Sequence, residues 1–210
     1  MKSVVPVLAP LLRSDAQGEL LALLYLHPEQ EYSLTDLARL LRASLSTVHT
    51  EISRLVTAGW VKQRRVGQAR LVQADTEHLL ARPLTEILEL TYGPTAVLPD
   101  VLATLPGIRE AHIYGSWAAR RLGEPGDPPR DIDVAVIGTP AHDLLLDAGK
   151  HASRLLHREV NLTRISPTVW DAGQDPFVTT LTSRPLVPIR LTRPPGSAVD
   201  GPVPPRTDAP

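Results

Sequence analysis

The segment Tyr114-Gly115-Ser116, followed after fourteen residues by Asp131-Ile132-Asp133-Val134-Ala135-Val136-Ile137, decides the fold of the second half of this chain. Apolar residues precede the Gly-Ser pair and follow the Asp-Ile-Asp triplet, which predicts two strands. Because side chains alternate along a strand, Asp131 and Asp133 project from one face. Two neighbouring carboxylates beside a small-residue turn that opens a helix suit a divalent metal carrying a phosphate. The alternative is that Asp-x-Asp simply begins an ordinary strand.

The Gly-Ser turn and the Asp-x-Asp strand resemble the nucleotidyltransferase superfamily that shares its palm with DNA polymerase beta, in particular its minimal bacterial and archaeal members. The resemblance implies that Gly115 lets a nucleoside triphosphate approach closely and that Ser116 donates a hydrogen bond to it. It also implies that Asp131 and Asp133 are catalytic and metal-binding, and hold one or two Mg²⁺ ions that bridge the triphosphate.

The chain departs from the superfamily at the third carboxylate, which usually lies on a later strand. The matching position here is Asn161. An amide oxygen can ligate a metal, but it carries no charge and cannot act as a base. Glu159 lies two residues away on the same face and could substitute for it. Catalysis therefore stays open, while the resemblance still implies the fold.

The pattern around this motif predicts a small mixed-sheet α/β nucleotidyltransferase-like domain over residues 93–190. Apolar runs and helical periodicity alternate along it. The expected elements are helices at about 95–104, 116–122 and 140–156, and strands at 108–114, 131–138 and 159–164.

The first part of the chain contains three helical segments and a hairpin. Leucines between residues 20 and 26 form the first helix, Ser33 caps a short second helix, and the third helix ends at Gly59. The buried stripe expected on the third helix is Leu45, Val48, Ile52, Leu55 and Val56. Residues 60–66 and 69–73 then alternate around Gly67-Gln68, which predicts a two-stranded hairpin.

With that stripe buried, short polar side chains of the third helix face outward and suit the major groove of double-stranded DNA. The hairpin adds basic residues without an acidic residue between positions 60 and 70, which suits phosphate contact. The DNA-binding candidates are Ser46, Thr47, His49, Thr50, Arg54, Lys62, Arg64, Arg65 and Arg70.

The order helix, helix-turn-helix and hairpin over residues 16–75 resembles the winged helix-turn-helix of the ArsR and MarR families of bacterial regulators. That resemblance implies a DNA-binding domain. Winged helices also serve as protein-interaction modules, so this alternative stays open. The predicted class is α+β, with an N-terminal winged helix-turn-helix followed by the nucleotidyltransferase-like domain.

Residues 76–92 carry a further apolar stripe that links the two domains, with Pro83 either kinking the helix or starting a new one. Helices in this place commonly form dimer interfaces in the two regulator families, which implies a homodimer; packing against its own domain is the alternative. The expected boundaries are residues 1–92 for the winged-helix domain with its linking helix, 93–190 for the second domain, and 191–210 for a disordered Pro-rich tail.

The bulk composition narrows the functional classes. The formal net charge is −1, so contact with nucleic acid must come from a local patch. The chain has no cysteine, which excludes disulfides and thiolate metal sites and fits a reducing cytoplasm. The apolar start is interrupted by Pro6 and Pro10, so neither a signal peptide nor a membrane span is expected.

Three functions follow from these patterns. The first is a transcriptional regulator whose second domain binds an Mg²⁺-nucleotide without turnover. The second is an active nucleotidyltransferase that transfers a nucleoside monophosphate to a hydroxyl of a protein, an RNA or a small molecule. The third, membership of a toxin-antitoxin pair, rests on family association alone.

Overall fold

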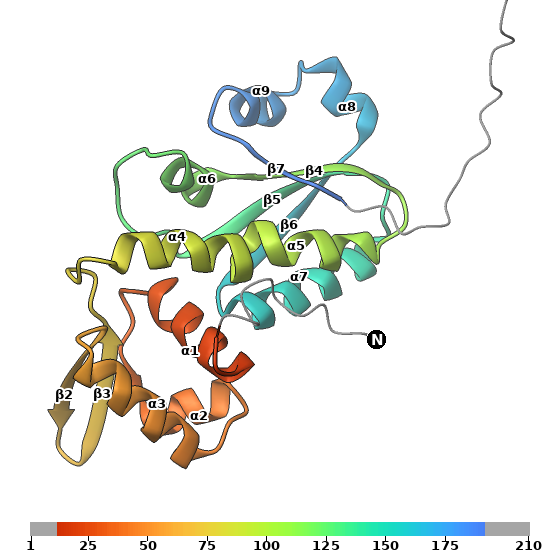
Figure 1. The fold of residues 1–210 in the computed structure, drawn as a ribbon. Coiled ribbons are helices and arrows are strands. Elements are labelled where there is room, and N and C mark those ends of the chain that lie inside the picture. Colours follow the sequence, from red (N-terminus) through yellow and green to blue (C-terminus); the bar gives the residue numbers. More distant parts are fainter. Residues whose placement is uncertain (1–11, 192–210) are drawn as a thin grey trace, which may run out of the picture.

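A computed structural model describes residues 12–191, and Figure 1 shows a helical N-terminal region connected by two successive helices to a mixed sheet. The N-terminal elements form a winged helix with a three-stranded sheet in the order β1-β3-β2. They are α1 (Asp15–Tyr25), β1 (Tyr32–Ser33), α2 (Leu34–Leu40), α3 (Leu45–Thr57), β2 (Val61–Val66) and β3 (Ala69–Ala74).

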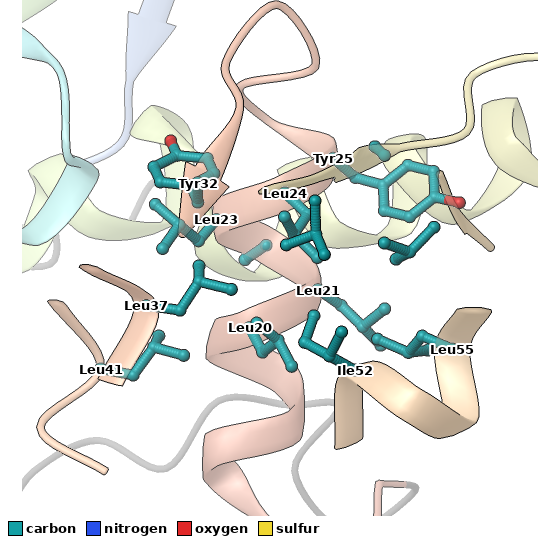
Figure 2. Close-up of a cluster of buried hydrophobic side chains, with 14 of the residues drawn as sticks. Leu20, Leu21, Leu23, Leu24, Tyr25, Tyr32, Leu37, Leu41, Ile52 and Leu55 are labelled. Carbon is teal, nitrogen blue, oxygen red and sulfur yellow. The ribbon is translucent and has the colours of Figure 1, made fainter. Parts of the chain in front are cut away.

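Helix α1 is the centre of the first core. Its residues from Leu20 to Tyr25 are all buried, because α2 and α3 pack on one side and α4 (Ala81–Tyr92) packs on the other. A helix that is apolar on every side must be covered on every side. Figure 2 shows the leucines of α1 pointing toward Leu37, Ile52 and Leu55 from α2 and α3.

Short-range polar contacts fix where α2 and α3 begin and end. The hydroxyl of Ser33 accepts a hydrogen bond from the amide of Asp36 at 3.1 Å, and that of Ser44 accepts one from the amide of Thr47 at 3.1 Å. Gly59 follows α3 with φ +78°, the left-handed conformation that a helix C-terminus favours. The cap expected at Ser33 and the stop expected at Gly59 are confirmed.

The structure corrects the predicted burial of Leu45 and decides between the two alternatives for Pro83. Leu45 is exposed although it was expected in the buried stripe, because it is the first residue of α3 and lies at the rim of the core. Pro83 does not kink a helix: it lies in the first turn of α4 (Ala81–Tyr92), where its missing amide proton has no intrahelical partner to lose.

Helix α4 packs on α1 through Ala81 and Leu88, which belong to the first core. On the same helix, Ile87 and Leu90 are exposed. The helix thus packs against its own domain on one face and leaves apolar side chains on another. The homodimer stays a prediction.

The second half contains a four-stranded sheet in the order β6-β5-β4-β7, in which only the β5–β6 pair is parallel. The α+β class is therefore confirmed, as a winged helix followed by a mixed sheet with helices. Its elements are α5 (Pro94–Ala103), β4 (Ile108–Tyr114), α6 (Gly115–Arg121), β5 (Asp131–Gly138), α7 (His142–Leu156), β6 (Glu159–Ile165), α8 (Pro167–Ala172), α9 (Pro176–Thr182) and β7 (Val187–Ile189).

The two faces of this sheet are covered by different helices (Figure 1). Helices α5 and α7 pack on the face that carries Ile132, Val134 and Val136. The opposite face carries Ala135 and Ile137, against which α9 packs. Asp131 and Asp133 share that second face, but they lie at the start of β5, before the residues that α9 covers, and both are half-buried.

The elements after β6 were not predicted, although the sequence carries their signals. Ser166 caps α8 with Pro167 in its first turn, and Asp175 caps α9 with Pro176 in its first turn. Proline directly after an N-cap residue is a common helix start. The Pro-rich tail expected to be disordered lies outside the described residues, apart from Leu191. None of the helices within residues 12–191 is long and apolar enough to cross a membrane.

Candidate functional site

The predicted carboxylate pair lies on one face of the sheet. In the parallel β5–β6 pair, Asp131 is opposite Glu159 and Asp133 is opposite Asn161, so the four side chains share a face. Asn161 is thus the residue beside Asp133 on the neighbouring strand. The Asn161 amide donates a hydrogen bond to Oδ1 of Asp133 at 3.2 Å.

Gly115 is the point where α6 begins against this face. Its φ is +73°, and a Cβ built on it would lie 2.9 Å from Oδ2 of Asp133. Two reasons therefore favour glycine here: the left-handed backbone and the close carboxylate. Ser116, the next residue, is exposed on the first turn of α6.

Burial raises the pKa of Asp133, and the hydrogen bond from Asn161 works against that rise. The charges of Asp131 and Glu159 raise it further. A divalent cation beside Asp133 would relieve both the desolvation and the repulsion, so the chemistry of Asp131 and Asp133 fits Mg²⁺. Within the described residues, however, no group of three or more His, Cys, Asp or Glu side chains could hold a metal. Any ion here would rest on two carboxylates.

Arg120 and Arg121 are the basic residues in the last turn of α6. The guanidinium of Arg120 donates to the carbonyls of Glu124 and Pro125, and Gly126 packs directly on it. Arg120 therefore holds the Pro- and Gly-rich loop between α6 and β5. This arginine is a structural residue of the loop.

The predicted DNA-binding residues gather on α3 and on the β2–β3 wing. Ser46, Thr47, His49, Thr50 and Arg54 are exposed on α3. The hydroxyls of Ser46 and Thr47 each lie 2.8 Å from the Ser44 hydroxyl at the N-terminus of the helix. This leaves a polar face along α3.

The wing carries less free charge than its sequence suggests. Arg64 forms an ion pair with Glu31, and on the neighbouring helix α3 Arg54 pairs with Glu51. Lys62 lies 3.0 Å from both Asp75 and Glu77. These acidic partners lie outside the 60–70 segment, so the sequence window that shows only basic residues misses them.

Arg65 and Arg70 remain without an acidic partner among the described residues. They are directly opposite each other on the antiparallel strands, and with Gln63 and Arg64 they line an open hollow on the wing. Nε of Arg70 is buried without a hydrogen-bond partner in the part of the chain that the structure describes. Like charges placed opposite each other destabilise a hairpin unless an anion lies between them.

A junction between the two halves was missed by the sequence analysis. His27 is 3% exposed, and its Nε2 lies 3.1 Å from the carbonyl of Leu156 at the end of α7. Nη2 of Arg158 donates to the carbonyl of Leu26 at 2.9 Å and to Nδ1 of His27 at 3.0 Å. Glu29 lies 3.4 Å from the same nitrogen. No local pattern marks these residues, because more than 125 positions separate the partners.

Burial lowers the pKa of His27 to about 4, and the positive charge of Arg158 adds to that effect. The imidazole is therefore neutral at neutral pH. It donates from Nε2 to Leu156 and accepts at Nδ1 from Arg158, so one tautomer satisfies both contacts.

No family model matches this chain, and no curated protein matches it. The structure of MepR, a transcription regulator of the Staphylococcus aureus multidrug efflux pump MepA, is 21% identical over 39% of this chain and 62% of MepR, with a TM-score of 0.33. This chain thus spans less than two thirds of MepR.

Two further structures give similar values. A mutant of Lactococcus lactis ZitR in complex with DNA is 17% identical over 49% of this chain and 70% of ZitR, with a TM-score of 0.37. The zinc-dependent MarR family regulator AdcR, in its Zn(II)-bound state, is 24% identical over 49% of this chain and 64% of AdcR, with a TM-score of 0.33. Each likeness covers less than half of this chain, and such low values do not assign the chain to a family.

Proposed function

We propose that this protein is a DNA-binding transcriptional regulator whose second domain binds an Mg²⁺-nucleotide. The observation that carries DNA binding is the exposed polar face of α3 beside a wing that presents Arg65 and Arg70 together. A helix of this kind enters the major groove, and the wing reaches the neighbouring backbone. A phosphate between the two arginines would neutralise the repulsion that the hairpin otherwise carries.

The wing should determine the salt dependence of DNA binding. We expect the double variant Arg65→Ala/Arg70→Ala to lower the slope of log K against log salt by about 2, since each lost phosphate contact removes about 0.9. Fluorescence anisotropy with a fixed-length random duplex at several salt concentrations measures this slope. The matched control is Arg82→Ala, which removes an exposed arginine from α4.

The slope of the control should equal that of the wild type. If the double variant also kept the wild-type slope and affinity, the winged helix would not bind DNA through its wing, and its use as a protein-interaction module would be favoured.

Nucleotide binding is proposed for the face formed by Asp131, Asp133, Gly115 and Ser116. Asp131 and Asp133 would hold the Mg²⁺, which supplies charge neutralisation for the phosphates when bound. Gly115 leaves the space beside Asp133 into which a larger residue would intrude. Asn161 orients Asp133 by its hydrogen bond rather than acting as a base.

A titration with each nucleoside triphosphate, with and without Mg²⁺, tests this site. Binding at a hundredfold excess over Kd should raise the unfolding free energy by about 2.7 kcal/mol. We expect Asp133→Asn and Gly115→Ala each to remove this stabilisation. Asp143→Asn, an exposed residue on α7, is the control and should retain it. No Mg²⁺-dependent stabilisation of the wild type would overturn the proposal and leave the domain as a scaffold.

The alternative is an active nucleotidyltransferase. The observation that favours this second function is that Asp131, Asp133 and Glu159 lie on the same face of the sheet. In such an enzyme a hydroxyl would attack the α-phosphate and release pyrophosphate. Pyrophosphate release that Asp133→Asn abolishes would support the enzyme. Binding without release would support the regulator.

A further inference from the structure

A cleft of about 210 Å³ lies between the two halves, on the side of the sheet opposite Asp131 and Asp133. Its wall from the N-terminal half comes from the end of α1 and from α4. Its other wall comes from α6, the loop before β5, and Arg158, which directly precedes β6. Glu89, Trp117, Arg121 and Pro129 also line the cleft.

The charged groups in this cleft are unbalanced. Three guanidinium groups, of Arg120, Arg121 and Arg158, face two carboxylates, of Glu29 and Glu89. Burial raises the pKa of Glu89, and the charges of Arg121 and Arg158 oppose that rise. The cleft is therefore positively charged, and it would attract an anion.

Arg158 supplies donors that no protein group uses. Its side chain is only 8% exposed, and all three of its contacts run through Nη2. Its Nε and Nη1 have no hydrogen-bond partner among residues 12–191, yet the side chain lines the cleft. These two donors are therefore available to an acidic group of a ligand in the cleft.

The rest of the lining is flat and apolar. Trp117 and several prolines, including Pro128 and Pro129, present apolar surface to the cleft. Ligand sites combine such apolar walls with a few convergent polar groups. We propose that this cleft binds a small organic anion, with its acidic group on Arg158 and its apolar body against Trp117 and Pro129.

This site is separate from the proposed nucleotide face and does not depend on it. Because Arg158 also holds Leu26 and His27, an occupied cleft would bear directly on how the winged helix is held. An anion bound there would be an effector of the regulator proposed above.

Calorimetry with four probes tests the site on the full chain. The probes are phenyl phosphate, benzoate, inorganic phosphate and benzylamine, all at millimolar concentration. We expect phenyl phosphate or benzoate to bind, and benzylamine, which has a ring but the opposite charge, not to bind. Phenyl phosphate alone would identify a phosphate ester as the ligand, and benzoate alone a carboxylate. Inorganic phosphate binding as tightly as phenyl phosphate would overturn the role of the apolar walls.

Two variants of α4 make the test specific. Glu89→Gln removes a negative charge from the cleft and should tighten binding of the anionic probe by about threefold or more. The matched control is Glu86→Gln, the same change on the exposed face of the same helix, which should leave the affinity unchanged. Thr85→Trp should fill the cleft and abolish binding.

Two results would overturn the proposal. One is the absence of binding by both aromatic anions to the wild type. The other is equal affinity in the wild type, Glu89→Gln and Thr85→Trp, which would place the bound probe elsewhere. The Glu89→Gln test needs only a conservative change, so it stands even if Thr85→Trp does not fold.

Discussion

Replacing Arg158 by alanine should lower the free energy of unfolding by about 3 kcal/mol, the scale seen when one partner of a buried charged contact is removed. The side chain is almost fully buried and joins the turn before β6 to the end of α1. Its loss leaves Nδ1 of His27 and the carbonyl of Leu26 without their donor. Urea unfolding of the variant against the wild type measures the difference.

The control for this change is Arg154→Ala, which removes an exposed arginine from the last turn of α7. We expect its effect to be within about 0.5 kcal/mol of zero, as for other surface substitutions. Equal effects of the two substitutions would show that the junction adds no stability. It would then fail as the means by which the two halves hold each other.

Acid should destabilise the same junction, because the folded protein disfavours protonation of His27. The pKa of His27 is lowered from 6.5 to about 4 in the folded protein, so below pH 6.5 the unfolded chain binds the extra proton. Its contribution is therefore complete above pH 6.5 and is lost as the pH falls toward 4. The full loss is on the order of 3 kcal/mol.

Protonation has a direct geometric effect. A proton on Nδ1 would face the Nη2 donor of Arg158 at 3.0 Å, so the hydrogen bond would become a repulsive contact between two donors. Urea unfolding from pH 7 to pH 4 measures the dependence. His27→Gln should be less stable at pH 7 and should lose less stability over this range. If both proteins lost the same amount, His27 would not carry the acid sensitivity.

Local sequence patterns predicted most elements of the second half. The alternation of Ile132, Val134 and Val136 with Asp131 and Asp133 is set by the pleat of a single strand, so it can be counted along the chain. The register that places Asn161 opposite Asp133 comes from the parallel pairing of β5 with β6, two strands that the sequence pattern predicted separately. The helices α8 and α9 could also have been found, because Ser166-Pro167 and Asp175-Pro176 are short-range signals.

The electrostatics of the wing could not be read in the same way. Arg64 and Lys62 looked equivalent to Arg65 and Arg70 in the sequence. The fold then brought Glu31 to Arg64 across 33 positions, and Asp75 and Glu77 to Lys62. An ion pair depends on distance in space, and sequence composition within one hairpin does not report it.

The sequence by itself determined the winged helix and the strand carrying Asp131 and Asp133, since caps, turns and periodicity act over a few residues. Only the tertiary structure decided which wing arginines remain unpaired, that the Asp133 carboxylate lies close against Gly115, and that His27 and Arg158 join the two halves. These contacts link residues 18 to 131 positions apart. Such contacts form only when packed elements bring their side chains together, and packing of a buried core is a property of the whole chain.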